Sequence, residues 1–303
     1  MNAPTIDTER TTEPTVEAIR HHYEVSNEFY ELLLGDSMMY SGGYWRQDED
    51  LCEQLSVAQF RKLDRFLELA EVRPGDRILD VGCGWGTMLE RAVKQFDVSS
   101  ATGVTLSRTQ AEWIDRKGDG RIKVNVESWE DHNRDAPYDA LFCISALEHF
   151  VLANLSPQER IRRYRTLFRK CQSLLRPGGK MVIHTMTVDK PPLDRAIISD
   201  LKFLLREEFA GCHTPHLHEL TDALEGVFEI TEMVQERETF ARACRAWLVR
   251  LAERREEAVA LEGEETVARF ERYLDIFAYM FEKGYFNNFR IVLSRRDDTA
   301  GRS

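Results

Sequence analysis

The spacing of hydrophobic residues changes near residue 71 of this chain. Before that point, residues 15–70 are predicted to be mostly helical. Within them, residues 57–71 carry apolar side chains at helical spacing, which predicts a helix with one buried stripe. The stripe consists of Phe60, Leu63, Phe66, Leu67 and Ala70. A Pro-Gly-Asp turn at residues 74–76 then ends the helical pattern.

After residue 76, short apolar runs alternate with helical patterns. The predicted strands cover residues 77–81, 100–105, 122–126, 138–144 and 180–185, with helices at 87–96 and 108–117. Such alternation is typical of βαβ units, in which helices cover both faces of a parallel sheet.

Beyond Thr187 the pattern becomes mostly helical. Residues 190–222 and 239–282 are predicted helical insertions, and strands at 227–233 and 287–294 complete the sheet. We therefore divide the chain into a disordered tail at 1–15, a helical N-terminal cover at 16–70, a core at 71–295 that includes both insertions, and a tail at 296–303.

The bulk composition limits the partners that the chain can bind. Its 303 residues are 43% hydrophobic and 31% charged, as in a soluble globular protein. A net charge of −11 argues against nucleic acid and against docking on anionic lipid by charge alone, because both reward clustered Lys and Arg. No apolar run reaches the ~20 residues of a membrane span, so no stable membrane insertion is predicted.

The N-terminal residues and the cysteines indicate a cellular location. Residues 1–15 lack the apolar core of a signal peptide. The six cysteines are far apart and form no CxxC pair, which favours free thiols in a reducing compartment. We therefore predict a cytoplasmic protein.

The strongest motif is ILDVGCGWG at residues 78–86. Its apolar residues predict a buried strand, and Gly82, Gly84 and Gly86 let the chain turn sharply and let a ligand approach the main chain. A dinucleotide fingerprint would add an acidic residue about twenty positions later, whereas residues 103–107 read GVTLS. A nicotinamide oxidoreductase is therefore disfavoured, and Asp80 is the acid that the motif itself supplies.

Two sequence patterns resemble those of class I S-adenosylmethionine-dependent methyltransferases. They are D-x-G-x-G in the glycine motif and LLRPGGKMVIHT at residues 174–185. A narrower resemblance, to the cyclopropane-fatty-acid synthase and mycolic-acid methyltransferase family, extends over residues 18–295. It rests on five segments in order: HHYEVSNEFYELLLGDSMMYSGGYW, LDVGCGWG, GVTLSRTQ, ALEHF and VIHT.

This resemblance implies the fold and the cofactor. The expected fold is a Rossmann-like α/β fold with a mostly parallel seven-stranded sheet, helices on both faces, a helical N-terminal cover and a helical insertion near the C-terminal end. S-adenosylmethionine is the expected cofactor, and the resemblance assigns ten residues to it. Tyr40 and Ser41 close over its methionine end with Tyr23 nearby, Asp80, Gly82 and Gly84 line it, Thr105, Leu106 and Gln110 reach the ribose, and Trp129 flanks the adenine.

The resemblance also implies a two-step reaction. In this family an alkene attacks the methyl group, and a base then removes a proton from the resulting carbocation. The family's base is a bicarbonate held by a glutamate, a histidine, a tyrosine and backbone near a cysteine. Glu148 and His184 match two of these positions, at the ends of parallel strands where open α/β sheets carry their chemistry.

Two departures from the family pattern concern the bicarbonate. Gly42 stands where the family motif Y-S-C-x-Y has its cysteine, and Phe240 stands where a tyrosine is expected. Bicarbonate is therefore a doubtful cofactor here. The second step, proton removal and ring closure, is expected to differ or to be absent.

The acceptor is left open by the sequence. Only about seventy residues precede the core, which together with the negative charge favours a soluble acceptor, either a small hydrophobic metabolite or a chain bound to a carrier protein. The alternatives are a true cyclopropane synthase, a small-molecule N-methyltransferase and a scaffold without catalysis. No metal is predicted, although His213, His216 and His218 have a spacing that metal sites use.

Overall fold

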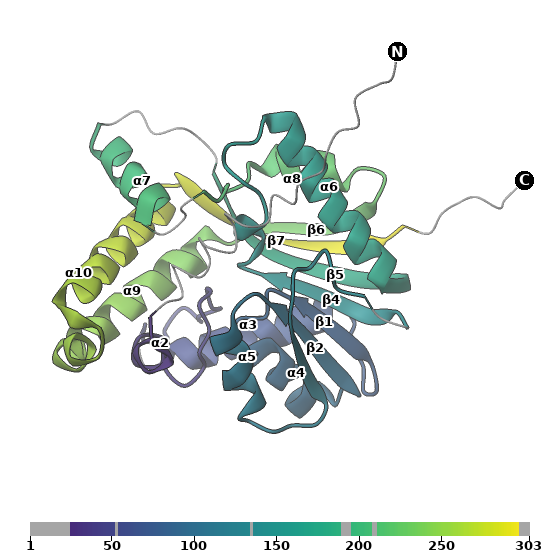
Figure 1. Ribbon diagram of the computed structural model, residues 1–303, viewed down its shortest axis with the longest axis horizontal. Helices are drawn as coiled ribbons and strands as arrows, with labels where there is room; N and C mark the ends of the chain where they lie inside the picture. Colours follow the sequence, from purple (N-terminus) through teal and green to yellow (C-terminus); the bar gives the residue numbers. More distant parts are fainter. Residues whose placement is uncertain (1–24, 52–53, 134–135, 189–194, 208–210, 297–303) are drawn as a thin grey trace, which may run out of the picture.

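A seven-stranded sheet forms the centre of the computed structural model, which describes residues 25–51, 54–133, 136–188, 195–207 and 211–296 (Figure 1). Its strands are β1 (Arg77–Val81), β2 (Ser100–Thr105), β3 (Ile122–Val126), β4 (Tyr138–Ile144), β5 (Leu175–Val188), β6 (Phe228–Gln235) and β7 (Phe286–Arg295). They lie in the order β3-β2-β1-β4-β5-β7-β6. All pairings from β3 to β5 are parallel, and β7 runs antiparallel to β5 and β6. The mostly parallel seven-stranded sheet is therefore confirmed.

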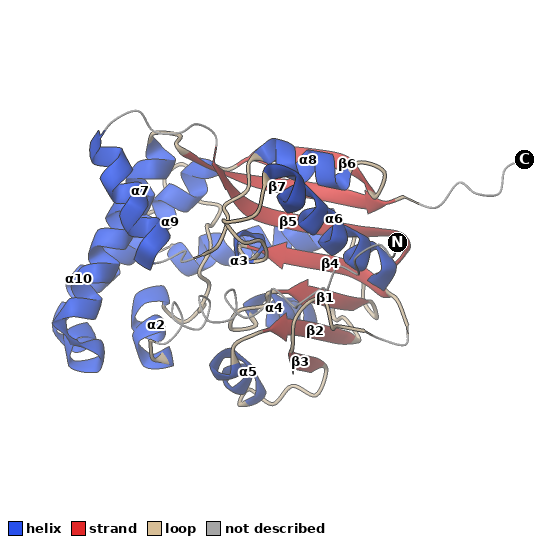
Figure 2. Cartoon of the chain, turned by 45° about the horizontal axis from the view of Figure 1, so that its top comes forward, coloured by secondary structure: helices blue, strands red, loops and turns tan. Residues whose placement is uncertain are grey.

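Both faces of the sheet are buried because successive apolar residues of each strand point to opposite sides. Ile78, Phe142 and Val182 belong to a core with α3 (Leu55–Leu69) and α4 (Thr87–Phe96). Leu79 and Cys143 belong to a second core with α6 (Pro157–Leu174) and α8 (Leu217–Leu224) (Figure 2). Helix α5 (Arg108–Asp115) adds Ile114 to the first of these cores, and the short 3₁₀-helix η1 (Leu147–His149) adds Leu147 to the second.

A helical layer lies beyond one end of the strands (Figure 1). It consists of α2 (Asn27–Leu34), α7 (Arg195–Glu207), α9 (Arg237–Glu253) and α10 (Arg255–Glu282). These helices share a third core that is rich in aromatic residues. Trp85, just after β1, donates a 2.8 Å hydrogen bond from its indole nitrogen to Asn27 of α2, so this layer adjoins the carboxyl ends of the parallel strands.

The predicted helix over residues 15–70 is wrong for residues 35–51, which form a loop between α2 and α3. Gly35, with φ of 75°, ends α2 because a left-handed backbone cannot continue the helix. The predicted stripe of α3 packs against one core of the sheet, with Phe60 at its margin. Phe60 is only half buried, while the polar Gln59 and Lys62 are fully buried on the inner face.

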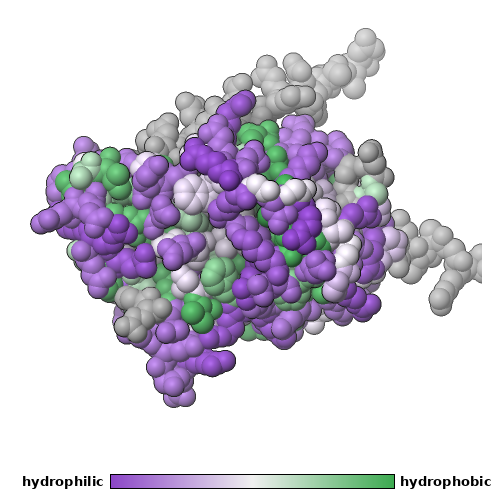
Figure 3. Space-filling model, turned by 90° about the horizontal axis from the view of Figure 1, so that it is seen from below, coloured by the Kyte–Doolittle hydropathy of each residue, from purple (hydrophilic) through white to green (hydrophobic). Residues whose placement is uncertain are grey.

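The predicted strand at 180–185 is the middle of a longer strand, β5. Its pairing with β4 shifts register between Tyr138 and Ala140, opposite residues 176–179, which contain the sequence Pro-Gly-Gly. No helix of the described ranges is long and apolar enough to cross a membrane. The face drawn in Figure 3 is mostly hydrophilic, with small apolar groups between the polar ones.

Candidate active site

An elongated cleft opens at the carboxyl ends of β1, β2 and β4. The first part has a volume of about 560 Å³, including its opening to solvent. Its lining residues include Thr105, Leu106, Trp129 and Phe150. The adjoining part, of about 540 Å³, is lined among others by Tyr40, Ser41 and Asp80. The two parts share Gly82, Gly84, Gln110 and Ser145, so they form one continuous site. The structure therefore brings together nine of the ten residues predicted for the cofactor, and Tyr23 lies outside the described residues.

The glycine turn forms the floor shared by both parts. Gly82 and Gly84 have φ values of 83° and 52°, which side chains rarely adopt. A Cβ on Gly84 would meet no atom within 4 Å, whereas one on Gly82 would collide with Ala146. A ligand can therefore approach the main chain directly at Gly84.

The first part of the cleft ends in an aromatic slot. The ring centroids of Trp129 and Phe150 lie 6.2 Å apart, and the Arg163 guanidinium lies 5.1 Å from the Trp129 ring. Thr105 Oγ1 donates a 2.9 Å hydrogen bond to Gln110 Oε1, which fixes the amide beside this slot. Phe150 was not predicted as a site residue, although it is the last residue of the segment ALEHF.

Asp80 is the buried charge of the second part. It is 3% exposed, and its Oδ1 has no hydrogen-bond partner among the described residues. Burial raises the pKa of this carboxyl to about 7, against the opposing charge of Lys62. A buried carboxylate with a free oxygen at a cleft is suited to a cationic ligand group.

Helix α3 fixes the loop that carries Tyr40 and Ser41. Gln59 Nε2 donates 2.9 Å hydrogen bonds to the carbonyl oxygens of Met39 and Ser41, and its Oε1 accepts one of 2.7 Å from Ser37. A Cβ on Gly43 would lie 2.9 Å from the backbone nitrogen of Gln59. The second glycine of YSGGYW is therefore required by the close approach of the loop to α3.

Lys62 is a fully buried cation beside this loop. Its Nζ donates to Ser41 Oγ. Burial lowers the pKa of Lys62 to about 7, although the charges of Glu236 and Asp80 raise it. Sequence reasoning missed Lys62, and the available signal was a lysine one turn before Phe66 on the apolar stripe of α3.

A second polar cluster surrounds Glu236, between β6 and α9. Tyr44 Oη lies 2.7 Å from both carboxylate oxygens, and Arg290 Nε donates a 2.8 Å hydrogen bond to Oε1. His184 Nε2 lies 3.5 Å from Oε2. Burial raises the pKa of Glu236, but the hydrogen bonds and charges of these partners lower it to about 2. Glu236 is therefore a buried, ionised carboxylate, and no sequence motif predicted its role.

The two predicted catalytic residues have different partners. Glu148 lies on η1, where its Oε1 accepts a hydrogen bond from the backbone nitrogen of Met186. Its Oε2 has no partner among the described residues, and burial raises its pKa to about 7. His184, on β5, faces Glu236 instead, and burial lowers its pKa. The hydrogen bond and charge of Glu236 oppose this lowering.

The described residues do not fit a bicarbonate held as in the family pattern. A Cβ on Gly42 would lie 2.9 Å from Thr239 Oγ1 and 3.3 Å from the Phe240 nitrogen, so the first turn of α9 fills the space of the family's cysteine. The Phe240 ring packs 4.8 Å from that of Phe281 and supplies no hydroxyl group. The Met186 nitrogen is bonded to Glu148, and His184 already faces a carboxylate, which repels a second anion.

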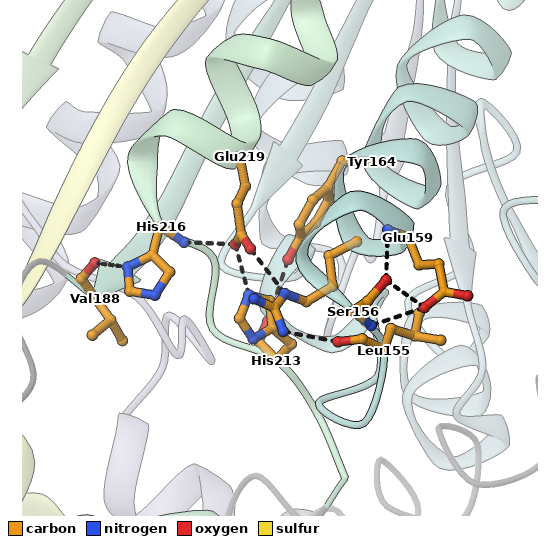
Figure 4. A network of polar contacts seen from close by, with 9 residues as sticks. Leu155, Ser156, Glu159, Tyr164, Val188, His213, His216 and Glu219 are labelled. Atoms are coloured by element: carbon orange, nitrogen blue, oxygen red, sulfur yellow. Dashed lines mark hydrogen bonds and ion pairs between the residues drawn. The ribbon is translucent and has the colours of Figure 1, made fainter.

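Two of the three spaced histidines, His213 and His216, belong to a separate network (Figure 4). His213 Nε2 lies 2.7 Å from Glu219 Oε2, and Arg160 Nε donates a 2.8 Å hydrogen bond to Glu219 Oε1. His216 Nδ1 lies 2.8 Å from the Val188 carbonyl oxygen. His218 is exposed and stacks on the His216 ring. Two of the histidines thus tie the loop before α8 to its neighbours.

Comparisons with known proteins identify a family, relatives and solved structures that are similar to this chain. A family model described as mycolic acid cyclopropane synthetase matches residues 10–291. Cyclopropane mycolic acid synthase 2 of Mycobacterium tuberculosis (strain CDC 1551 / Oshkosh) is 31% identical over 286 residues, which cover 90% of this chain and 92% of that protein. The cyclopropane synthase MmaA2 of Mycobacterium tuberculosis superposes with a TM-score of 0.84 at 29% identity, covering 93% of this chain and 99% of that one.

A second solved structure contains ligands. The mycolic acid cyclopropane synthase CmaA1, complexed with SAH and CTAB, has a TM-score of 0.83 at 29% identity and covers 93% of this chain and 99% of that one. The chain belongs to the mycolic acid cyclopropane synthetase family.

Proposed function

We propose that this protein transfers a methyl group to an alkene carbon of a hydrophobic acceptor. As a member of its family, the chain is an S-adenosylmethionine-dependent transferase. The observation that carries the proposal is the continuous cleft, which joins an aromatic slot at Trp129 to the unpartnered carboxylate oxygen of Asp80.

The cleft supports a role for each of its residues. We assign the adenine to the slot of Trp129, the ribose to Thr105, Leu106 and Gln110, and the cofactor's ammonium group to Asp80. Gly82 and Gly84 would contact the cofactor through the main chain, and Tyr40 and Ser41 would close over its methionine end, near which we also assign Tyr23. Aromatic rings beside a sulfonium cation stabilise it by about 0.5–2 kcal/mol each.

The bound cofactor supplies a methyl group on a sulfonium, so that attack by an alkene breaks the C–S bond and leaves on the acceptor a carbocation that must lose a proton. The chain's task is therefore to align the alkene, to exclude water and to accept that proton. We propose that Glu148 accepts it through Oε2, since this oxygen has no partner in the described structure and the carboxyl is buried. We propose His184 as the second catalytic residue, at the end of the neighbouring strand.

The aromatic side chains of α9 and α10 support an apolar acceptor. The ring centroids of Tyr40 and Trp247 lie 5.2 Å apart, and Phe240 connects Trp247 to Phe277 and Phe281 of α10. The methyl end of the cleft thus adjoins an aromatic layer. We propose an unsaturated chain, either free or bound to a carrier protein, and a cytoplasmic location for the reaction.

Label transfer tests this proposal. Methyl-labelled S-adenosylmethionine is incubated with monounsaturated fatty acids, the same chains on an acyl carrier protein, prenyl compounds and small amines. We expect label in an alkene acceptor, and product NMR then separates a methyl branch from a cyclopropane ring. Label only in amines would instead indicate an N-methyltransferase. Failure to bind S-adenosylhomocysteine in calorimetry would refute the cofactor assignment.

A further inference from the structure

We infer that the Glu236 carboxylate, from within the chain, replaces the bound anion of the family pattern as the negatively charged partner of His184, so that this protein needs no bicarbonate. The inference rests on the proposed function, because it concerns the same catalytic site. It starts from the disagreement between the family pattern and the residues around His184.

The first argument is the geometry of the Glu236 carboxylate. It accepts hydrogen bonds from Tyr44 Oη at 2.7 Å and from Arg290 Nε at 2.8 Å. His184 Nε2 lies 3.5 Å from its other oxygen. The side chains of Glu236 and Arg290 are each 8% exposed. A hydroxyl, a guanidinium and an imidazole from three distant segments thus converge on one buried carboxylate, which is the donor set that an anion site requires.

The second argument is electrostatic. Arg290 also pairs with Glu232, and Lys62 is buried nearby, where the charge of Glu236 raises its pKa. The ionised carboxylate balances these buried cations. A dissolved anion bound beside His184 would place a second negative charge a few ångströms from the Glu236 carboxylate. The repulsion between the two charges is unfavourable in a poorly solvated site.

The third argument is steric. The position of the family's cysteine at Gly42 is filled by Thr239, whose Oγ1 donates a 2.7 Å hydrogen bond to the Glu236 carbonyl oxygen. The same turn therefore fills the cysteine's space and presents the Glu236 side chain to His184. In this arrangement Glu236 is a positioning residue, which holds His184 in place of the external anion.

Anion binding tests the inference without any acceptor. Glu236→Ala should leave a hollow of carboxylate size lined by Tyr44, Arg290 and His184. Thermal unfolding is measured with rising formate or bicarbonate, against chloride at equal ionic strength. We expect a saturable rise of several degrees in the Tm of this variant, because ligands that bind only the folded state stabilise it. The wild-type protein should show no such rise.

Two variants serve as controls. Glu236→Gln keeps the side-chain volume and leaves no hollow, so small anions should not stabilise it. Glu232→Ala removes the other partner of Arg290 at a position that is 38% exposed, and should also show no specific anion effect. An equal response in either control, or no response in a folded Glu236→Ala protein, would overturn the inference.

A measurement on the wild-type protein covers the case in which Glu236→Ala does not fold. Labelled bicarbonate is observed by ¹³C NMR in the presence of S-adenosylhomocysteine. We expect no line broadening from the protein beyond that of a viscosity control, and saturable broadening would refute a built-in anion. Calorimetry of S-adenosylhomocysteine binding on the same samples tests the proposed function separately, because the anion result does not depend on it.

Discussion

Gly42 and Thr239 contact each other so closely that a Cβ on residue 42 would lie 2.9 Å from Thr239 Oγ1. The contact joins the loop of Tyr40 and Ser41 to the first turn of α9, and it accounts for the glycine at a position where the family pattern has a cysteine. The departure from the pattern is thus coupled to the position of Glu236, which immediately precedes that turn and lies three residues before Thr239.

Restoring the family's cysteine should destabilise this protein. For Gly42→Cys we expect a loss of about 1–3 kcal/mol in the free energy of unfolding, because the side chain overpacks a filled space. Urea denaturation measures the loss. Gly120→Ala is the matched control, since a Cβ there meets no atom within 4 Å. A Gly42→Cys protein as stable as this control would contradict the contact.

Asp80 should determine cofactor affinity. Asp80→Asn keeps the size of the side chain but removes its charge, and a hydrogen bond to a charged group contributes about 1.5–3 kcal/mol. We expect the affinity for S-adenosylhomocysteine to fall about tenfold to a hundredfold, as measured by calorimetry. Asp115→Asn, at an exposed position on α5, should bind like wild type. Equal affinities of the two variants would remove Asp80 from the site.

Glu148 should lower the stability of the protein at neutral and alkaline pH. Its pKa in the folded state is raised from 4.5 to about 7, so stability is full below pH 4.5 and is lost as pH rises through 7. Glutamine imitates the protonated acid. Glu148→Gln should therefore match wild type near pH 4.5 and be more stable by a few kcal/mol above pH 7.

Chemical denaturation across this pH range measures the difference. Glu68→Gln, on the exposed face of α3, should follow the wild-type curve. A constant difference between Glu148→Gln and wild type at every pH would show that the pKa of the carboxyl is not raised. Under the proposed function, Glu148→Gln should also bind S-adenosylhomocysteine normally and lose methyl transfer.

Glu219 should act as a structural carboxylate. Its side chain is fully buried between the partly buried Arg160 and His213, so Glu219→Gln leaves Arg160 without its charged partner and should cost about 1–3 kcal/mol of stability. His218→Ala, at the exposed neighbour, should change stability by less than about 0.5 kcal/mol. A chelator should leave the Tm of the wild-type protein unchanged, and a drop would instead indicate a metal at these histidines.

The sheet and the cofactor cleft could be predicted because their signals are local. Each strand is a short apolar run, and the turn after β1 needs glycines whatever surrounds it. The carboxyl ends of parallel strands meet at one edge, so Asp80, Thr105 and Glu148 were expected near each other. The helix boundary at Gly35 was missed. The loop at residues 35–51 is held by hydrogen bonds from Gln59 of α3 rather than by a periodic pattern in its own sequence.

The sequence by itself determined the strand and helix pattern, the glycine turn and the family, because periodicity and motifs lie in neighbouring residues. Only the tertiary structure decided that Lys62 is buried and that Glu236 faces His184, with Tyr44 and Arg290 as its other partners. These residues lie far apart along the chain, and their charges interact only after the sheet, α3 and α9 exclude water from the space between them. Burial and the approach of charges are properties of packing, which no local pattern records.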